Sequence, residues 1–578
     1  MADQHHPPAR RHACRASVHG AACAMLAACG VLASSLGAQP ARGAGGPADL
    51  VLTGGRVFTA DSTRPWAQAV AVRGARVLAV GSDADVLRHA GPRTRRVALG
   101  GRAVVPGFND AHDHVGASAP PGAVRFTVDA GPTPDPSLGA VRDSLAALVR
   151  RVPAGRWLAT TVGGRALDEP TAARAALDEV APAHPVWITG WSGHGALLNT
   201  AGLRAAGLLD APDPPGGWQT RDADARPTGR VDEYALLGAA RRLALAAGPA
   251  ATLAAARAHG AESVRLGITT VQDMATGYTP TVARALAASG AMRVRHRILR
   301  FPMTDGAGRA GEWALAGADT VLGATTHVAG VKWVLDGTPV ERLALMREPY
   351  ADRAGWHGRA NFPADTVRAL LRDALARGWQ PMLHAVGDST IALLFAAMQD
   401  VAPDSVWRRV RPRLEHGDGL ARDQFDAARR LGVVVVQNPS HLAIPQILGA
   451  RWGTERLARL GHLRSLVEAG IPLAFGSDGP RSPGLNLMLA TLHPNRPGEA
   501  LTREQAVAAY TRGSAWAEHA EREKGTLAPG MLADLAVLSQ DVFTVPPPAL
   551  PATTSVLTLV GGRIVHDALG APRRSPVE

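Results

Sequence analysis

Lysine is the scarcest charged residue in this 578-residue sequence: Lys332 and Lys524 are the only lysines among 62 basic residues. The formal net charge is +12, but the arginines are scattered along the chain and aromatic residues make up only 4%. A nucleic-acid-binding surface combines clustered basic residues with stacking aromatics, so we expect no nucleic-acid partner. The two lysines are informative, because an amine supports chemistry that a guanidinium does not.

Cysteine is confined to the first 29 residues, at Cys14, Cys23 and Cys29. The rest of the chain can form no disulfide and offers no thiolate ligand, so a metal ion would need nitrogen and oxygen donors. Long hydrophobic runs are also missing after this segment: none reaches 18 uninterrupted apolar residues. We therefore expect no membrane-spanning helix.

Residues 1–44 have the pattern of an export signal, with arginines preceding a run of small apolar residues. The sequence Leu-Ala-Ala-Cys ending at Cys29 resembles a bacterial lipobox. Cleavage near Ala38 or Ala44 is the alternative. We expect export to the periplasm or the medium, with membrane attachment only if Cys29 is lipidated.

The two ends of the mature chain are rich in short strand-like runs, and the middle is not. Residues 48–103 and 525–570 therefore predict one small β-sandwich domain built from both termini. Residues 104–524 alternate strand-like and helical patterns, which is typical of a parallel sheet made from βα units.

Eight candidate strands in the middle portion predict a (β/α)₈ barrel of the TIM type, in which functional side chains lie at the carboxyl ends of the strands. They are residues 104–106, 267–273, 292–301, 328–335, 381–384, 413–416, 432–437 and 471–475. Residues 115–250 are too many for one loop, so we expect an inserted subdomain after the first strand.

Metal-binding side chains recur at the predicted strand ends. His112 and His114 alternate, so in an extended segment both imidazoles leave on the same side. The alternative for this pair alone is two polar loop histidines. His384 and His416 end the fifth and sixth strands, and Asp478 follows the eighth.

Lys332 lies inside the fourth predicted strand. An ammonium cannot bind a cation, but a buried amine with a lowered pKa can react with CO₂. The resulting carbamate has two oxygens that can bridge two metal ions, and arginine cannot form it. The alternative is a structural lysine paired with Asp336 or Glu341.

Several motifs together resemble the amidohydrolase superfamily, and in particular its third large sequence family, which includes N-substituted formamide deformylase-like proteins. They are Pro-Gly-Phe-x-Asp-x-His-x-His ending at His114, the lysine of Val-Lys-Trp-Val-Leu-Asp-Gly, His384-Ala-Val-Gly-Asp, Glu415-His416 and Gly-Ser-Asp478. The resemblance extends over roughly residues 48–565.

The resemblance implies that His112 and His114 bind one divalent metal ion, that His384 and His416 bind a second, and that carboxylated Lys332 bridges them. Asp478 would complete the metal site, orient the attacking water and remove its proton. Zinc suits a hydrolytic site with nitrogen and oxygen donors, although Mn, Fe and Ni are also compatible.

Further residues are candidates for contacts with the substrate. His194, together with Asn199, and Glu233 match segments of the family and are expected to face the substrate; purely structural roles are the alternative. His441 is a candidate hydrogen-bond donor to a tetrahedral intermediate.

These features predict an exported, metal-dependent hydrolase that cleaves a non-peptide C–N bond in a small amide-like substrate. An enzyme of the same superfamily acting on esters, lactones or phosphoesters, or catalysing an isomerisation or decarboxylation, is the nearest alternative. A non-catalytic metal-binding protein is a more distant one. The sequence leaves the substrate and the oligomeric state open, with a homodimer as one option.

Overall fold

The structure is a computed structural model that describes residues 45–116, 119–128, 135–304 and 320–570. The predicted export signal, with Cys14, Cys23 and Cys29, lies outside the described residues. Within the described part of the chain, no helix is both long enough and apolar enough to cross a membrane.

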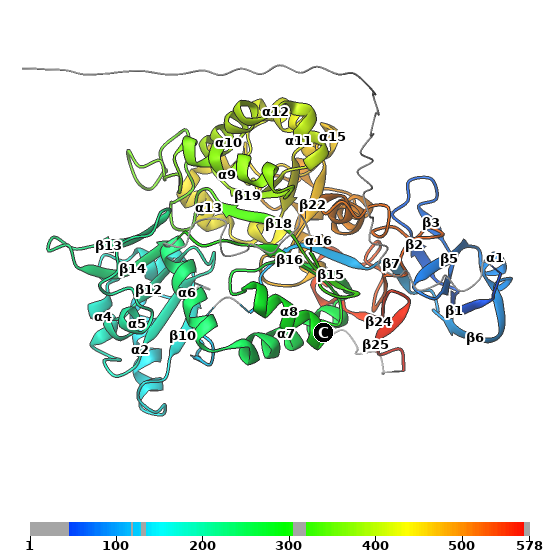
Figure 1. Cartoon of the computed structure of the whole chain (residues 1–578), viewed down its shortest axis with the longest axis horizontal. Coiled ribbons are helices and arrows are strands. Elements are labelled where there is room, and N and C mark those ends of the chain that lie inside the picture. The colour runs from blue at the N-terminus through cyan, green and yellow to red at the C-terminus, as the bar shows by residue number, and fades with distance from the viewer. Residues whose placement is uncertain (1–44, 117–118, 129–134, 305–319, 571–578) are drawn as a thin grey trace, which may run out of the picture. The chain divides into compact units, whose positions relative to one another are not determined.

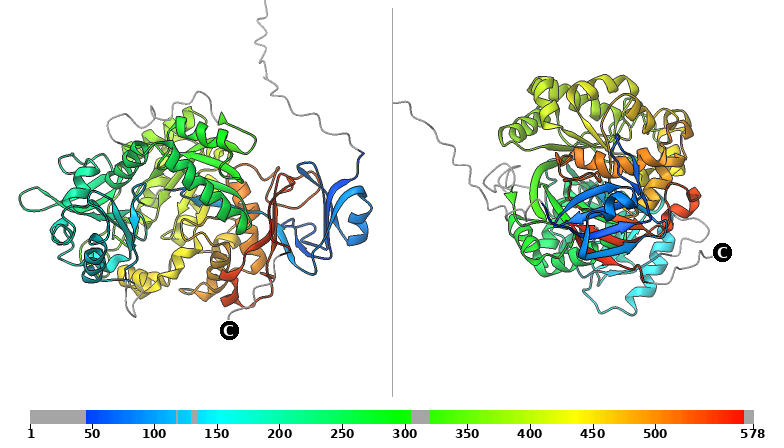
Figure 2. Two further views of the ribbon diagram at one scale, coloured as in Figure 1. Left: turned by 90° about the horizontal axis from the view of Figure 1, so that it is seen from below. Right: turned by 90° about the vertical axis from the view of Figure 1, so that its right-hand side faces the viewer.

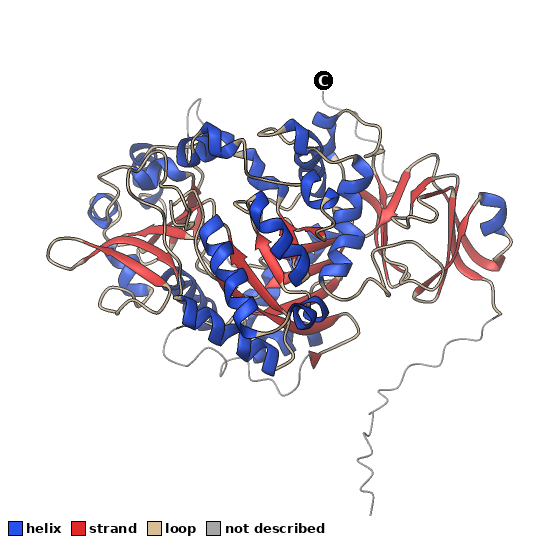
Figure 3. Ribbon diagram, turned by 90° about the horizontal axis from the view of Figure 1, so that it is seen from above, coloured by secondary structure: helices blue, strands red, loops and turns tan. Residues whose placement is uncertain are grey.

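Eight parallel strands form the central barrel, as predicted (Figures 1 and 3). They are β8 (Phe108–Asp113), β15 (Ile268–Met274), β16 (Arg295–Arg300), β18 (Thr326–Val334), β19 (Pro381–Ala385), β20 (Arg413–His416), β21 (Val434–Gln437) and β22 (Leu473–Phe475). The first and last strands meet where the Asp478 amide donates to the His112 carbonyl over 2.9 Å. This contact brings both ends of the barrel sequence to one site.

Helices cover the outside of the barrel (Figure 3). In α9 (Ala364–Ala376) the buried residues are Val367, Leu370, Leu371 and Ala374, the spacing of one helical face. Because such helices cover the sheet, barrel strands such as β21 are apolar on both faces. The other helices of this part are α7 (Pro249–Arg265), α8 (Pro280–Ser289), α10 (Asp388–Val401), α11 (Asp404–Val410), α12 (Phe425–Leu431), α13 (Pro445–Trp452), α14 (Thr454–Leu457), α15 (Arg464–Glu468), α16 (Pro483–Leu492), α17 (Arg503–Ala508) and α18 (Ser514–Ala517).

The predicted first barrel strand, residues 104–106, was wrong. These residues belong to β7 (Ala103–Pro106), which pairs with β2 (Arg56–Phe58) and β23 (Leu535–Leu538) in a terminal sheet. The barrel begins at Phe108, the first residue of β8, so His112 lies within a strand. Gly107 separates the two strands, and a Cβ atom there would come within 2.2 Å of the Thr269 side chain.

The two termini build two β-sheets with a shared hydrophobic core, which confirms the predicted β-sandwich (Figure 2). One sheet has the order β25-β24-β23-β7-β2-β3 and the other β5-β4-β1-β6. Their strands not yet given are β1 (Ala48–Thr53), β3 (Trp66–Ala67), β4 (Ala69–Arg73), β5 (Arg76–Gly81), β6 (Ala90–Ala98), β24 (Ser555–Val560) and β25 (Arg563–Asp567); α1 (Asp83–Leu87) joins β5 to β6.

An inserted subdomain follows β8, as expected, and contains its own six-stranded sheet of order β13-β14-β12-β11-β10-β9. Its strands are β9 (Val124–Arg125), β10 (Leu158–Val162), β11 (Val186–Gly190), β12 (Gly195–Leu198), β13 (Gly217–Arg221) and β14 (Pro227–Glu233). Its helices are α2 (Leu138–Val149), α3 (Gly164–Asp168), α4 (Arg174–Asp178), α5 (Thr200–Ala205) and α6 (Tyr234–Ala246). Residues of β10, of β11 and of the turn after β11 (residues 191–194) reach the barrel site described next.

Candidate active site

The six residues predicted to form the metal site all line one cavity of about 180 Å³ at the carboxyl ends of the barrel strands. They are His112, His114, Lys332, His384, His416 and Asp478. These residues lie between positions 112 and 478, so the fold brings together side chains that are far apart along the chain.

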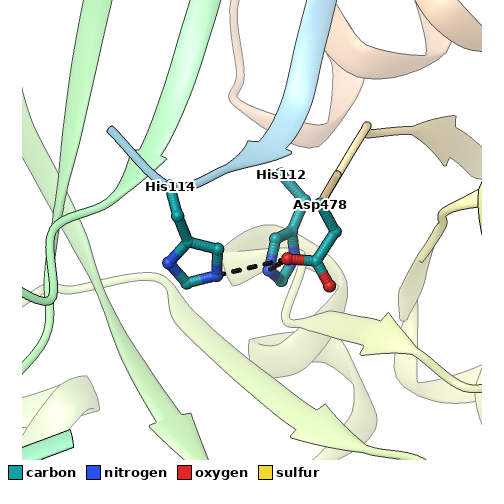
Figure 4. Close-up of side chains that lie close together, drawn as sticks. All are labelled: His112, His114 and Asp478. Atoms are coloured by element: carbon teal, nitrogen blue, oxygen red, sulfur yellow. Dashed lines mark ion pairs between the residues drawn. The ribbon is translucent and has the colours of Figure 1, made fainter. Parts of the chain in front are cut away.

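The carboxylate of Asp478 faces His112 and His114 (Figure 4) and also lies near His416 and His441. Its Oδ1 is 3.3 Å from His114 Nε2 and 3.7 Å from His112 Nε2. Its Oδ2 is 3.8 Å from His416 Nδ1 and 3.6 Å from His441 Nε2. The backbone φ angle of Asp478 is 48°, in the left-handed region that is unfavourable for most residues, so the fold holds this carboxylate in place at a local cost.

Two overlapping triads in this site have ligand atoms close enough to hold a metal ion: His112, His114 and Asp478, and His416, His441 and Asp478. In each triad the potential ligand atoms lie within 4.8 Å of one another. Imidazole nitrogens and a carboxylate suit Zn²⁺ and related divalent ions. The donor set therefore fits metal binding, as predicted from the sequence.

His384, the other predicted ligand of the second ion, is in neither triad, but its ring centroid lies 4.5 Å from that of His416. Its Nε2 is buried without a hydrogen-bond partner, and Asp336 Oδ1, 4.0 Å away, is too distant. A buried polar atom without a partner is costly. Binding a metal ion would give His384 Nε2 a partner, so the environment of this residue also fits the predicted site.

Lys332 is buried, and its Nζ lies 3.5 Å from His112 Nε2. The acids considered as structural partners bond elsewhere: Asp336 accepts backbone N–H groups of Val386 and Gly387, and Glu341 accepts the Thr338 hydroxyl. Burial lowers the pKa of Lys332 to about 8, which increases the fraction of neutral amine near neutral pH. That is the form that reacts with CO₂.

Burial also keeps the imidazoles neutral. It lowers the pKa of His112 to about 4, with a further contribution from Lys332, and it lowers the pKa values of His384 and His416 well below the ordinary range. Neutral imidazole is the form that binds metal. Burial alone would raise the pKa of Asp478, but the surrounding histidines, His112 foremost, hold it well below its usual value, so Asp478 is ionised.

Two side chains that were not predicted as site residues orient the predicted ligands. His112 Nδ1 lies 2.6 Å from Glu415 Oε2, and Glu415 is in turn held by Arg413. His416 Nδ1 lies 2.8 Å from Asn438 Oδ1. Such partners fix the ring orientation of a metal-binding histidine. The position of these residues at strand ends could have indicated their role, since Glu415 directly precedes His416 and Asn438 directly follows β21.

His441 is held by Asp418, another residue that the sequence analysis missed. His441 Nδ1 lies 3.0 Å from Asp418 Oδ2, while Nε2 points toward Asp478. Burial would lower the pKa of His441, but Asp418 and Asp478 raise it to about 10. A protonated His441 cannot ligate a metal ion, so we expect it to act as a hydrogen-bond donor beside Asp478 rather than as a ligand in the triad of His416, His441 and Asp478.

His194 lines the metal-site cavity, whereas Glu233 lies fully buried behind it. His194 Nδ1 is 2.9 Å from Glu233 Oε1, and Asn361 donates to the other carboxylate oxygen over 3.0 Å. Burial and Glu233 act in opposite directions on His194, with a net rise in its pKa. We therefore expect Glu233 to influence a substrate through His194.

Asn199, predicted to accompany His194 at the substrate, has a structural role instead. It is fully buried, and its carboxamide oxygen caps α5 by accepting the Gly202 N–H and also accepts the Val186 N–H. Its amide donates to the carbonyls of Ala181 and His184. All the polar capacity of its side chain is used inside the subdomain.

The chain belongs to the amidohydrolase family, whose sequence pattern matches residues 95–566. It is 27% identical over 562 residues to N-substituted formamide deformylase of Arthrobacter pascens, covering 90% of this chain and 99% of that protein. It is 28% identical over 561 residues to Protein LONG AFTER FAR-RED 3 of Arabidopsis thaliana, covering 90% of this chain and 92% of that protein.

Solved structures share the fold. An uncharacterized metal-dependent hydrolase from Pyrococcus furiosus superimposes with a TM-score of 0.65 at 23% identity, covering 86% of this chain and all of that one. Another from Pyrococcus horikoshii OT3 gives a TM-score of 0.66 at 21% identity, covering 86% and 99%. The family match and the histidine–aspartate triads identify the protein as a metal-dependent hydrolase.

Proposed function

We propose that this enzyme hydrolyses a non-peptide C–N bond in a small amide-like substrate at a binuclear metal centre. The observation that carries the proposal is the cavity lined by all six predicted metal-site residues, with Asp478 at its centre. The similarity to N-substituted formamide deformylase over nearly the whole chain supports an amide bond as the target.

The proposal divides the predicted histidine ligands between two ions. His112 and His114 would hold one divalent ion, His384 and His416 the other, and the carbamate of Lys332 would bridge them, with zinc as the first candidate. When bound, the ions would supply Lewis acidity toward the substrate carbonyl and lower the pKa of a water.

The protein's own groups account for the proton movements. Asp478 accepts a proton from the attacking water as the new C–O bond forms, and returns it to the nitrogen as the C–N bond breaks. His441, held by Asp418, donates a hydrogen bond to the oxygen that gains negative charge. His194 offers a second donor from the inserted subdomain.

A substrate panel tests this function. The metal-loaded enzyme would be assayed on N-formyl and N-acetyl amines, on esters with the same acyl groups, and on lactones, with Asp478→Asn as the inactive control. We expect release of amine from the amides by the wild type alone. Turnover of the esters or lactones without turnover of any amide would contradict the proposal.

We also propose that residues 1–44 direct export. Mass spectrometry of the protein produced in a bacterium would show a mature form beginning near residue 39 or 45, or at a lipidated Cys29. Cys29→Ser would abolish membrane association only in the lipidated case. A mature protein that keeps residue 1 would refute the export proposal.

A further inference from the structure

A second cavity, of about 470 Å³, adjoins the metal site and shares six of its lining residues. The shared residues are Trp191, Ser192, His194, His384, His416 and Asp478. A volume of this size is typical of a small-molecule site. The reacting bond would lie at the shared wall, so the larger cavity receives the bulk of the substrate.

One part of the lining of this cavity is apolar. It includes Pro339 and Val340 from the loop after β18, Val386 after β19, and Ile444 and Leu448 around the start of α13. Val386 and Leu448 belong to a buried hydrophobic cluster with Met346 and Trp452, against which Ile444 packs. The apolar wall is thus the face of a packed cluster and is formed before any substrate binds.

Among the described residues that line this cavity there is no lysine or arginine. Arg451, the nearest candidate on α13, is turned toward Asp168 and Asp352 and donates to the Val340 carbonyl. The cavity also contains Asp418, and Glu341 bonds to the lining residues Ser192 and Thr338. A substrate carboxylate would lose its hydration here without an arginine or lysine to replace it.

Two of the histidines that line the cavity already have carboxylate partners. His441 is paired with Asp418 and His194 with Glu233, so each imidazole has its own carboxylate. The Nε2 atom of His441 lies 3.6 Å from Asp478 Oδ2, and each imidazole can offer a single hydrogen bond to the substrate. This leaves apolar contact as the main source of binding energy for the substrate's larger half.

We propose that the enzyme prefers amides whose larger substituent is uncharged and apolar, and that Ile444 is a specificity-determining residue for this substituent. This inference rests on the proposed function. It excludes N-acyl amino acids and other amides with a carboxylate near the reacting bond as good substrates.

The test compares two amides that differ only by a carboxylate, N-acetyl-phenethylamine and N-acetyl-phenylalanine, in the wild type, Ile444→Arg and Leu87→Arg. Leu87 is a surface residue of α1, far from the cavity in the sequence, and serves as the matched control. We expect the wild type to have a kcat/KM at least tenfold higher for the uncharged amide than for the acid. In Ile444→Arg, this ratio of the two kcat/KM values should fall at least tenfold. Leu87→Arg should leave it unchanged.

Ala443→Arg is a second variant at the same wall, at an exposed position where folding is less at risk. It should shift the ratio in the same direction. A wild type that cleaves both amides equally, or prefers the acid, would overturn the inference while leaving the proposed function intact. If neither amide nor any other in the panel is cleaved, the proposed function itself fails, and the inference with it.

Discussion

His112 Nδ1 lies 2.6 Å from Glu415 Oε2, and both side chains are almost completely buried at the carboxyl ends of the barrel strands. The contact fixes the ring of His112 so that its Nε2 faces Lys332 and Asp478. Glu415 is therefore part of the support on which the proposed metal centre depends.

Glu415→Gln keeps the shape of this side chain but removes its charge, and we expect metal affinity to fall about 10–100-fold. Competition with a fluorescent chelator would measure it, and thermal unfolding would report any loss of stability from the unpaired Arg413. Glu455→Gln is the matched control, because the Glu455 side chain is 91% exposed. An unchanged metal affinity in Glu415→Gln would show that Glu415 does not support the metal site.

Asp478→Asn should reduce kcat at least about a hundredfold, because the amide cannot accept the proton of the attacking water. Steady-state kinetics on a cleaved amide would measure the loss, with metal content determined on the same sample. Asp224→Asn, at a well-exposed carboxylate, should retain full activity. Full activity of Asp478→Asn would show that another group acts as the base.

An ion-pair cluster ties the inserted subdomain to the barrel loops. Asp168, at the end of α3, bonds to Arg342 over 2.8 Å and also to Arg451. We expect Asp168→Asn to raise KM several-fold with little change in kcat, because the subdomain supplies Trp191 and His194 to the cavities. Hydrogen exchange of residues 164–168 should also accelerate. Asp365→Asn, which breaks an exposed ion pair, is the control. Equal KM values in both variants would show that Asp168 does not position the subdomain for substrate binding.

Glu499 should make the free energy of unfolding depend on pH. Burial would raise its pKa, but hydrogen bonds from Ser465 and the nearby His462 lower it to about 2. Because the folded-state pKa is depressed, its contribution is present above the unfolded-state pKa of about 4.3 and is lost as the pH falls toward 2. Glu499→Gln should cost on the order of 1–3 kcal/mol at pH 7.

Urea unfolding at a series of pH values would measure this contribution, and the difference between wild type and Glu499→Gln should shrink below about pH 4. Glu468→Gln, at an exposed position on α15, should show no such difference. A cost that does not depend on pH would mean that Glu499 contributes through packing alone.

The fold was largely predictable because barrel strands such as β21 and β22 are short apolar runs that alternate with helical patterns, and an apolar strand of this kind follows from burial on both faces. The first strand was misplaced because β7 and β8 are separated only by Gly107. Both runs are fully buried, and only their pairing partners, in different sheets, distinguish them.

The site was predictable where a ligand ends a strand, since all strand ends of a parallel barrel meet at one edge. Asp418 and Asn438 were missed because an acid or amide near a strand end becomes a partner only through three-dimensional contact. Asn199 was misassigned for the same reason, since its bonds to four backbone groups are visible only in the folded subdomain.

The central claim is that carboxylated Lys332 bridges two metal ions. The most direct test measures metal per chain by elemental mass spectrometry in the wild type, Lys332→Arg and Lys524→Arg, and the carbamate by ¹³C NMR after exposure to labelled bicarbonate. Lys524, buried against Glu518 and Thr270, is the control because it is the only other lysine.

We expect about two equivalents of metal and one carbamate signal in the wild type and in Lys524→Arg. Lys332→Arg should bind one equivalent or less and lose the signal. The same metal content in all three proteins, with no carbamate signal in the wild type, would contradict the bridging role of Lys332.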